Sequence, residues 1–140
     1  MRRWSIAVQD IGKLVGRRLV YFGVWPATMV SSSIRPIGSA HCSVYESGEA
    51  KLEDIGIDPP YRNNGIGSKL LEEIEKWAAS KGVKHLYGDL SSVDSDRFTV
   101  LHHLYTNHGW TWRLFGKNDS RLSPGSNIVG IVEKTISLKS

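Results

Sequence analysis

The sequence is poor in cysteine. Cys42 is the only one in 140 residues, so no internal disulfide can form and a zinc cluster built on cysteines is excluded. Such usage is typical of a reducing compartment, and we expect a cytoplasmic protein. Cys42 lies on an expected strand without a Cys–His pattern around it, which favours a small core residue over a nucleophile.

Long apolar runs are also missing. A membrane-spanning helix needs roughly 20 apolar residues, and the sequence contains no such stretch. Met1-Arg2-Arg3 is positively charged, but the apolar segment that follows, residues 4–8, is too short for a secretory signal. We therefore expect no membrane partner.

The charge is unevenly distributed along the chain, although the net value is only +4. Residues 1–35 hold six basic residues and one acidic residue, whereas residues 46–96 hold eleven acidic and six basic ones. A basic segment can attract nucleic acid, yet no basic stripe with interleaved aromatics and no helix-turn-helix pattern is present. We interpret the basic segment as a solvated surface and expect no nucleic-acid partner.

The remaining composition is that of a globular protein. Apolar residues make up 40% and charged residues 23%, and 140 residues suit one core, so we expect a single domain over residues 1–140. The first half is rich in β-branched and aromatic residues, and Gly12 and Gly16 disfavour a long helix. It predicts an antiparallel meander with strands at residues 3–8, 18–25, 37–45 and 50–57, and a further candidate strand at 27–34.

The second half changes to helical periodicity. Apolar residues at helical spacing predict a helix over 68–80, and Asp94-Ser95-Asp96 offers caps for a second helix over about 97–108. Strands are expected at 83–90, 110–115 and 127–136. The crossover through the first helix makes strand 83–90 parallel to strand 52–57. The predicted fold class is α/β (α+β), with a mixed central sheet and two flanking helices.

Residues 55–71 are the most informative stretch, because their pattern predicts a strand, a glycine-bearing loop and the first turn of a helix. Pro59 and Pro60 end the strand. Gly65 and Gly67 let the backbone approach a ligand, and the helix that follows begins with free N–H groups. Such a corner favours an anion, usually phosphate. An ordinary strand–helix turn is the alternative, and the pattern matches neither the Rossmann nor the P-loop sequence.

Two motifs in this order resemble the GCN5-related N-acetyltransferase (GNAT) superfamily. The first is Arg62-x-x-Gly65-x-Gly67, and the second is the Leu-Tyr-x-x-x-Gly-Trp pattern that contains Tyr105. The similarity covers about residues 37–115. It implies a sheet whose strands 50–57 and 83–90 splay apart, with acetyl-CoA (coenzyme A) in the gap. The residues that the resemblance implies for cofactor binding are Ile55, Gly56, Ile57, Arg62, Asn63, Asn64, Gly65, Ile66, Gly67 and Ser68. Gly56 would suit a β-bulge that breaks ordinary pairing.

The resemblance implies an enzyme that transfers an acetyl group to a primary amine by direct attack. Tyr105 is the candidate general acid toward the coenzyme A sulfur, because a phenol stays protonated at neutral pH. A packing role is the alternative. Glu53 is the candidate base, although it and Asp54 should point to opposite faces of a strand. His41, His85 or a water chain are weaker candidates for the base.

Other features limit what the family resemblance implies. Residues 9–35 are strand-rich where the family usually has two helices, and Phe98 stands where an Asn often contacts the cofactor. The acceptor is therefore left open as a small-molecule or protein amine, on a monomer or homodimer. A catalytically inactive acyl-CoA-binding module is the alternative function. The histidines at 102, 103 and 108 lack a ligand spacing, so we expect no metal.

Overall fold

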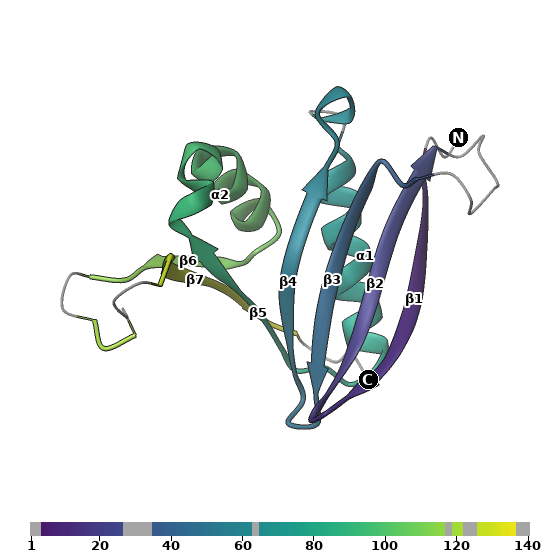
Figure 1. Ribbon diagram of the computed structural model, residues 1–140, viewed down its shortest axis with the longest axis horizontal. Helices are drawn as coiled ribbons and strands as arrows, with labels where there is room; N and C mark the ends of the chain where they lie inside the picture. The colour runs from purple at the N-terminus through teal and green to yellow at the C-terminus, as the bar shows by residue number, and fades with distance from the viewer. Residues whose placement is uncertain (1–3, 27–34, 63–64, 117–118, 122–125, 137–140) are drawn as a thin grey trace.

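The computed structural model describes residues 4–26, 35–62, 65–116, 119–121 and 126–136. Seven strands form one sheet in the order β1-β2-β3-β4-β5-β7-β6 (Figure 1). The strands are β1 (Trp4–Leu14), β2 (Arg17–Pro26), β3 (Gly38–Tyr45), β4 (Glu49–Ile57), β5 (His85–Ser91), β6 (Thr111–Leu114) and β7 (Ile128–Thr135). The helices are η1 (Pro59–Tyr61), α1 (Ile66–Ser80), η2 (Ser92–Arg97) and α2 (Phe98–Asn107). This arrangement confirms the predicted mixed sheet with two flanking α-helices.

Strands β1 to β4 form the predicted antiparallel meander, and we call them, together with α1, the first arm. Helix α1 crosses one face of this arm, whereas no described helix crosses the face toward the viewer in Figure 1. The core lies under α1, where Phe22 and Cys42 from the strands and Leu70 and Ile74 from the helix are fully buried. Cys42 is thus a core residue, and its burial raises the pKa of the thiol to about 12.

Strand β1 is longer than the sequence predicted, and it forms an edge of the sheet. It pairs with β2 along its whole length, with a bulge at Ile11 between the pairs of Asp10 and Gly12. Residues 9–13 lack the alternation of a half-buried strand because they are mostly exposed. The candidate strand at 27–34 lies outside the described residues.

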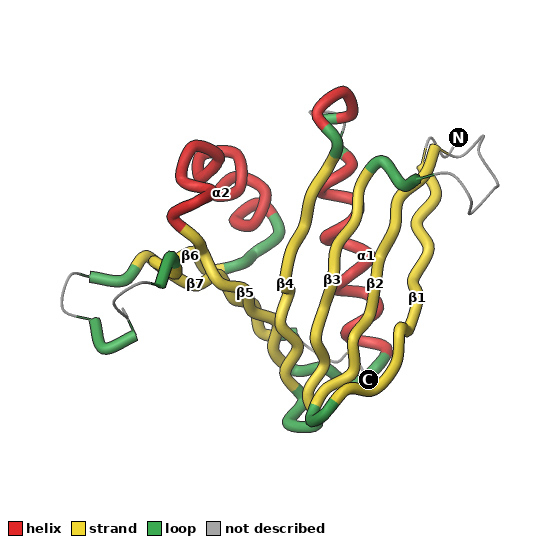
Figure 2. Tube along the Cα trace, viewed as in Figure 1, coloured by secondary structure: helices red, strands yellow, loops and turns green. Residues whose placement is uncertain are grey.

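Strands β5, β7 and β6 with α2 form a second arm, which is joined to the first at one end of β4. Strand β5 is parallel to β4 as predicted, but the pairing covers only Glu49 to Lys51 with His85 to Tyr87. Beyond Lys51 the two parallel strands separate, so residues 52–57 do not pair with β5. Figure 2 shows the two arms diverging from this joint. The splayed strands implied by the family resemblance are thus confirmed.

A β-bulge interrupts β4, but not where the sequence suggested. Gly56 pairs regularly with Ser39, so the expected bulge at Gly56 is wrong. The extra residue is Glu53, because Cys42 pairs with Leu52 and the next residue back along β3, His41, pairs with Asp54. A bulge places two consecutive residues opposite one, so the strict alternation of side chains fails here.

The entry to α2 also differs from the prediction. Asp94, Ser95 and Asp96 lie inside the 3-10 helix η2, whose first turn is capped by the Ser91 hydroxyl accepting from the Val93 N–H at 3.3 Å. Helix α2 begins only at Phe98, and its N-cap residue, Arg97, makes no side-chain cap. Within the described residues, no helix is long and apolar enough to cross a membrane.

Candidate active site

A cleft lies between β4 and β5 where the two strands separate, and η2 and α2 form its third wall. Its volume is about 220 Å³. The residues that line it include Glu53, Asp54, Ile55, Asp89, Phe98 and Tyr105. The cleft therefore brings together the two residues that the sequence proposed for catalysis, Tyr105 and Glu53.

Tyr105 is the only buried residue of α2, with 6% of its surface exposed. Its ring packs on Trp110 at 5.2 Å and on Trp112 at 6.5 Å between centroids, which fixes its direction. Burial, with a smaller effect of Cys42, raises the pKa of the phenol well above its ordinary value. Among the described residues, no group forms a hydrogen bond with the hydroxyl. A protonated O–H that has no partner among the described residues, on a side chain that lines the cleft, is available to a ligand.

Glu53 lies in the same cleft but is already engaged. One oxygen, Oε2, accepts hydrogen bonds from Ser43 Oγ at 2.6 Å and from the Arg17 guanidinium at 3.1 Å. The ammonium of Lys51 lies 3.6 Å from Oε1. Two cations and a hydroxyl thus hold this carboxylate in place, and the geometry favours a structural role for Glu53 over the predicted role of base.

A second cavity, the loop pocket, adjoins the cleft and shares the wall residues Arg97 and Leu101 with it. Its volume is about 410 Å³. Six predicted cofactor-binding residues line it, namely Ile57, Arg62, Gly65, Ile66, Gly67 and Ser68. Asn63 and Asn64 lie outside the described residues. Ile55 lines the cleft and Gly56 lines a hollow on the outer face, so the predicted set surrounds a continuous region around the end of β4.

The start of α1 fits an anion in the loop pocket. Gly65 is the N-cap and adopts φ +76°, a left-handed conformation that favours glycine. No side chain caps the helix, and the first intrahelical bond runs from Lys69 N–H to the Gly65 carbonyl. The N–H groups of the residues between them therefore have no partner within the helix, which is the arrangement that binds phosphate.

The end of β4 offers main-chain groups to the cleft. Beyond Lys51, no described strand lies on the β5 side of β4, so backbone groups on that side lack a ladder partner. The Ile57 carbonyl is an exception, because the Arg62 side chain donates to it at 2.9 Å. These unpaired groups match the predicted role of residues 55–57 in holding an extended ligand.

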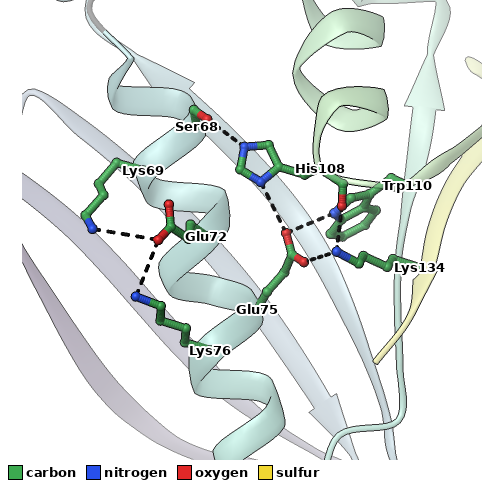
Figure 3. Close-up of polar contacts among 8 residues, drawn as sticks. All are labelled: Ser68, Lys69, Glu72, Glu75, Lys76, His108, Trp110 and Lys134. Atoms are coloured by element: carbon green, nitrogen blue, oxygen red, sulfur yellow. Dashed lines mark hydrogen bonds and ion pairs between the residues drawn. The ribbon is translucent and has the colours of Figure 1, made fainter. Parts of the chain in front are cut away.

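A polar cluster behind the loop pocket ties α1 to the second arm (Figure 3). The Ser68 hydroxyl lies 2.6 Å from His108 Nε2, and Nδ1 of the same ring lies 3.7 Å from Glu75. Glu75 accepts from Trp110 Nε1 at 3.3 Å and forms an ion pair with Lys134. Three elements that are distant in sequence thus meet at Glu75, 15% of whose side chain is exposed.

On the outer face of the first arm, opposite α1, the structure differs from the side-chain alternation that the sequence predicted for β4. Ser43 contacts Glu53, and His41 contacts Asp54. Ser43 and His41 lie two positions apart on β3, so their side chains share one face of the sheet. Glu53 and Asp54 therefore point to the same face, and the predicted opposition is wrong because of the bulge. His41 lines a hollow of about 490 Å³ on this face together with Gly56 and Ile57.

Comparisons with known proteins agree with this geometry. A model of the acetyltransferase (GNAT) family matches residues 6–110, and the chain belongs to this family. No protein with curated function matches the chain significantly. Within the part of the chain that the structure describes, no group of three or more His, Cys, Asp or Glu is placed to hold a metal ion.

Solved structures share the fold at low sequence identity. The ribosomal-protein-S18-alanine N-acetyltransferase of Escherichia coli is 17% identical, with a TM-score of 0.65 over 97% of each chain. A GNAT acetyltransferase of Streptococcus pneumoniae is 23% identical, with a TM-score of 0.62 over 85% of this chain and 67% of that one. The PaiA N-acetyltransferase of Thermoplasma acidophilum, solved with coenzyme A, is 22% identical, with a TM-score of 0.57 over 84% of this chain and 60% of that one.

Proposed function

We propose that this protein transfers an acetyl group from acetyl-CoA to a primary amine of a small molecule or protein, by direct attack while both are bound. The observation that carries the proposal is the hydroxyl of Tyr105, which has no partner among the described residues and lies in a cleft that continues into the loop pocket. The loop pocket would hold the pyrophosphate at the start of α1, and β4 would align the pantetheine arm toward Tyr105.

Different groups of the chain would carry out different parts of the reaction. Backbone N–H groups near Ile55 and Ile57 would polarise the thioester carbonyl, because unpaired donors that point at the carbonyl oxygen stabilise its developing negative charge. Holding both reactants in one cleft contributes several kcal/mol, roughly 7 or more in well-oriented systems. As the C–N bond forms and the C–S bond breaks, Tyr105 gives its proton to the sulfur and regains one from the nitrogen of the new amide.

Calorimetry with purified protein tests the donor site first. Acetyl-CoA and free coenzyme A should bind with micromolar affinity, because they share the pyrophosphate and pantetheine, whereas NADPH should give no signal. Heat with NADPH equal to that with coenzyme A would mean a general anion site. No heat with either coenzyme A species would remove the donor assignment and leave only the fold.

One observation favours the alternative, an acyl-CoA-binding module without turnover. Phe98 lines the cleft and packs on Trp112 at 5.3 Å, where a polar cofactor contact is common in the family. Product formation separates the two functions. An enzyme converts a panel of amines and releases coenzyme A, whereas a binding module gives the calorimetric signal with every amine left unmodified.

A further inference from the structure

His41 and Asp54 form a pair on the outer face of the first arm. Nδ1 of His41 lies 2.9 Å from Asp54 Oδ1, and the main-chain N–H of His41 donates to the same oxygen at 3.0 Å. A carboxylate oxygen only accepts hydrogen bonds, so Nδ1 carries the ring proton. In the neutral ring, Nε2 then holds a lone pair.

The lone pair of His41 is available. Among the described residues, no group forms a hydrogen bond or ion pair with Nε2, and 34% of the side chain is exposed. The ring is held from one side by Tyr21, whose centroid lies 4.9 Å away. A histidine oriented by a carboxylate, with its second nitrogen open, is the usual arrangement of a general base.

The position of the pair connects two cavities. Asp54 lines the cleft that contains Tyr105, whereas His41 lines the outer hollow beside Gly56 and Ile57. An amine that enters over the outer face, which no described helix crosses, would therefore reach His41 before it meets the thioester. The bulge at Glu53 creates this geometry, because it turns Asp54 to the same face as His41.

His85 lies on the same face and provides a contrast. Its Nδ1 lies 3.2 Å from Glu49 and its Nε2 lies 3.4 Å from Glu133, so carboxylates occupy both nitrogens. It also stacks on a tyrosine, Tyr87, at 5.8 Å, and 29% of its side chain is exposed. His85 thus matches His41 in exposure and surroundings but offers no free lone pair.

We propose that His41, oriented by Asp54, is the general base that deprotonates the acceptor amine. The inference rests on the acetyltransferase function proposed above. His41 Nε2 takes one proton from the ammonium, the neutral amine attacks the thioester carbon, and the C–N bond forms as the C–S bond breaks. The sulfur receives its proton from Tyr105, Tyr105 recovers one from the amide nitrogen, and the imidazolium returns its proton to water.

Two probe amines separate a base from a structural residue. Propylamine is protonated at neutral pH and needs a base, whereas 2,2,2-trifluoroethylamine is already neutral. In His41→Gln, turnover of propylamine should fall about 100-fold, the lower range for loss of a general base. Turnover of trifluoroethylamine should change less than a few-fold. Asp54→Asn should give an intermediate loss, because an amide still accepts from the His41 main-chain N–H.

The pH profile gives an independent readout. With propylamine, activity of the wild type and of the matched control His85→Gln should fall at acidic pH as the base becomes protonated, and should level off above that range. In His41→Gln, turnover should instead keep rising with pH toward the pKa of the amine itself, because only the free amine then reacts. The charged or titratable groups that face His41 are Asp54 and Tyr21, with Arg35, Asp58 and Arg62 across the hollow. None of these is changed in the control.

The outcomes distinguish this inference from the proposed function. Equal losses for both amines in His41→Gln, or an unchanged pH profile, would overturn the assignment of His41 while the enzyme stands. Binding of acetyl-CoA without turnover of either amine by the wild type would also overturn it and leave the donor site intact. Failure of the wild type to bind acetyl-CoA would instead refute the proposed function.

Discussion

The two arms of the sheet are built for different tasks. In the first arm, α1 buries five residues against the meander, whereas in the second arm α2 buries only Tyr105. The first arm therefore holds most of the apolar core, and the second directs a single functional side chain into the cleft. The platform and the reactive group therefore lie on separate units, and the contacts between these units include three ladder pairs of β4 with β5 and the polar cluster around Glu75.

Filling the space between the arms should have the largest effect. A Cβ on Gly67 would lie 3.6 Å from Leu104 of α2, so Gly67→Trp would occupy the loop pocket. Acetyl-CoA binding should be lost in calorimetry, with a small change in the melting temperature. Lys69→Trp, on the same helix with a side chain 44% exposed, is the control. Unaltered affinity in Gly67→Trp would show that coenzyme A does not use this pocket.

Removing the reactive group of the second arm should affect turnover alone. Tyr105→Phe deletes a hydroxyl without a partner among the described residues, so stability should hold while kcat falls about 100-fold. Affinity for acetyl-CoA should be unchanged. Tyr87→Phe, on the outer face of β5, serves as control. Full activity of Tyr105→Phe would exclude the phenol as the acid.

The ion pairs at the joint should contribute moderately to stability. Lys51 Nζ lies 2.8 Å from Asp89, across the point where β4 and β5 separate. This hydrogen bond raises the pKa of Lys51 above its ordinary value. Lys51→Met should lower the free energy of unfolding by about 0.5–1 kcal/mol at neutral pH, the range for a partly exposed pair.

The pH dependence of this loss has a defined sign. Because the folded pKa of Lys51 is raised, its contribution is fully present below the ordinary lysine pKa and is lost as pH rises through the folded value. The difference between wild type and Lys51→Met in urea unfolding should therefore shrink in strongly alkaline buffer. Lys76→Met, with a side chain 63% exposed, should show little loss at any pH. A constant difference would assign the effect to packing.

The contact between Ser68 and the second arm should have the smallest effect. Ser68→Ala removes one hydroxyl from the loop pocket and should weaken acetyl-CoA binding two- to threefold, about 0.5 kcal/mol. Acetyl-pantetheine, which lacks the pyrophosphate, should bind the variant and the wild type equally. Ser80→Ala at the far end of α1 is the control. An equal loss for both ligands would place Ser68 away from the phosphates.

The sequence predicted periodic elements well and local irregularities poorly. The α1 helix and the meander follow from side-chain spacing, because burial on one face imposes that spacing. The bulge at Glu53 leaves no such trace, since one extra residue alters the register without changing composition. The pairing of His41 with Asp54 could not be predicted from the sequence for the same reason, because strict alternation along a strand would place Glu53 and Asp54 on opposite faces of the sheet. The loop was found because Gly65 and Gly67 are sequence signals in themselves.

The bulge at Ile11 has a consequence for the handling of the protein. Strand β1 presents eleven residues at the edge of the sheet, with no partner on its outer side among the described strands. A long, flat edge recruits further chains and seeds aggregation. The extra residue interrupts the row of main-chain groups, and the ion pair of Asp10 with Arg18, at 2.7 Å, adds charge there. The longest strand thereby carries its own protection against edge-to-edge growth at high concentration.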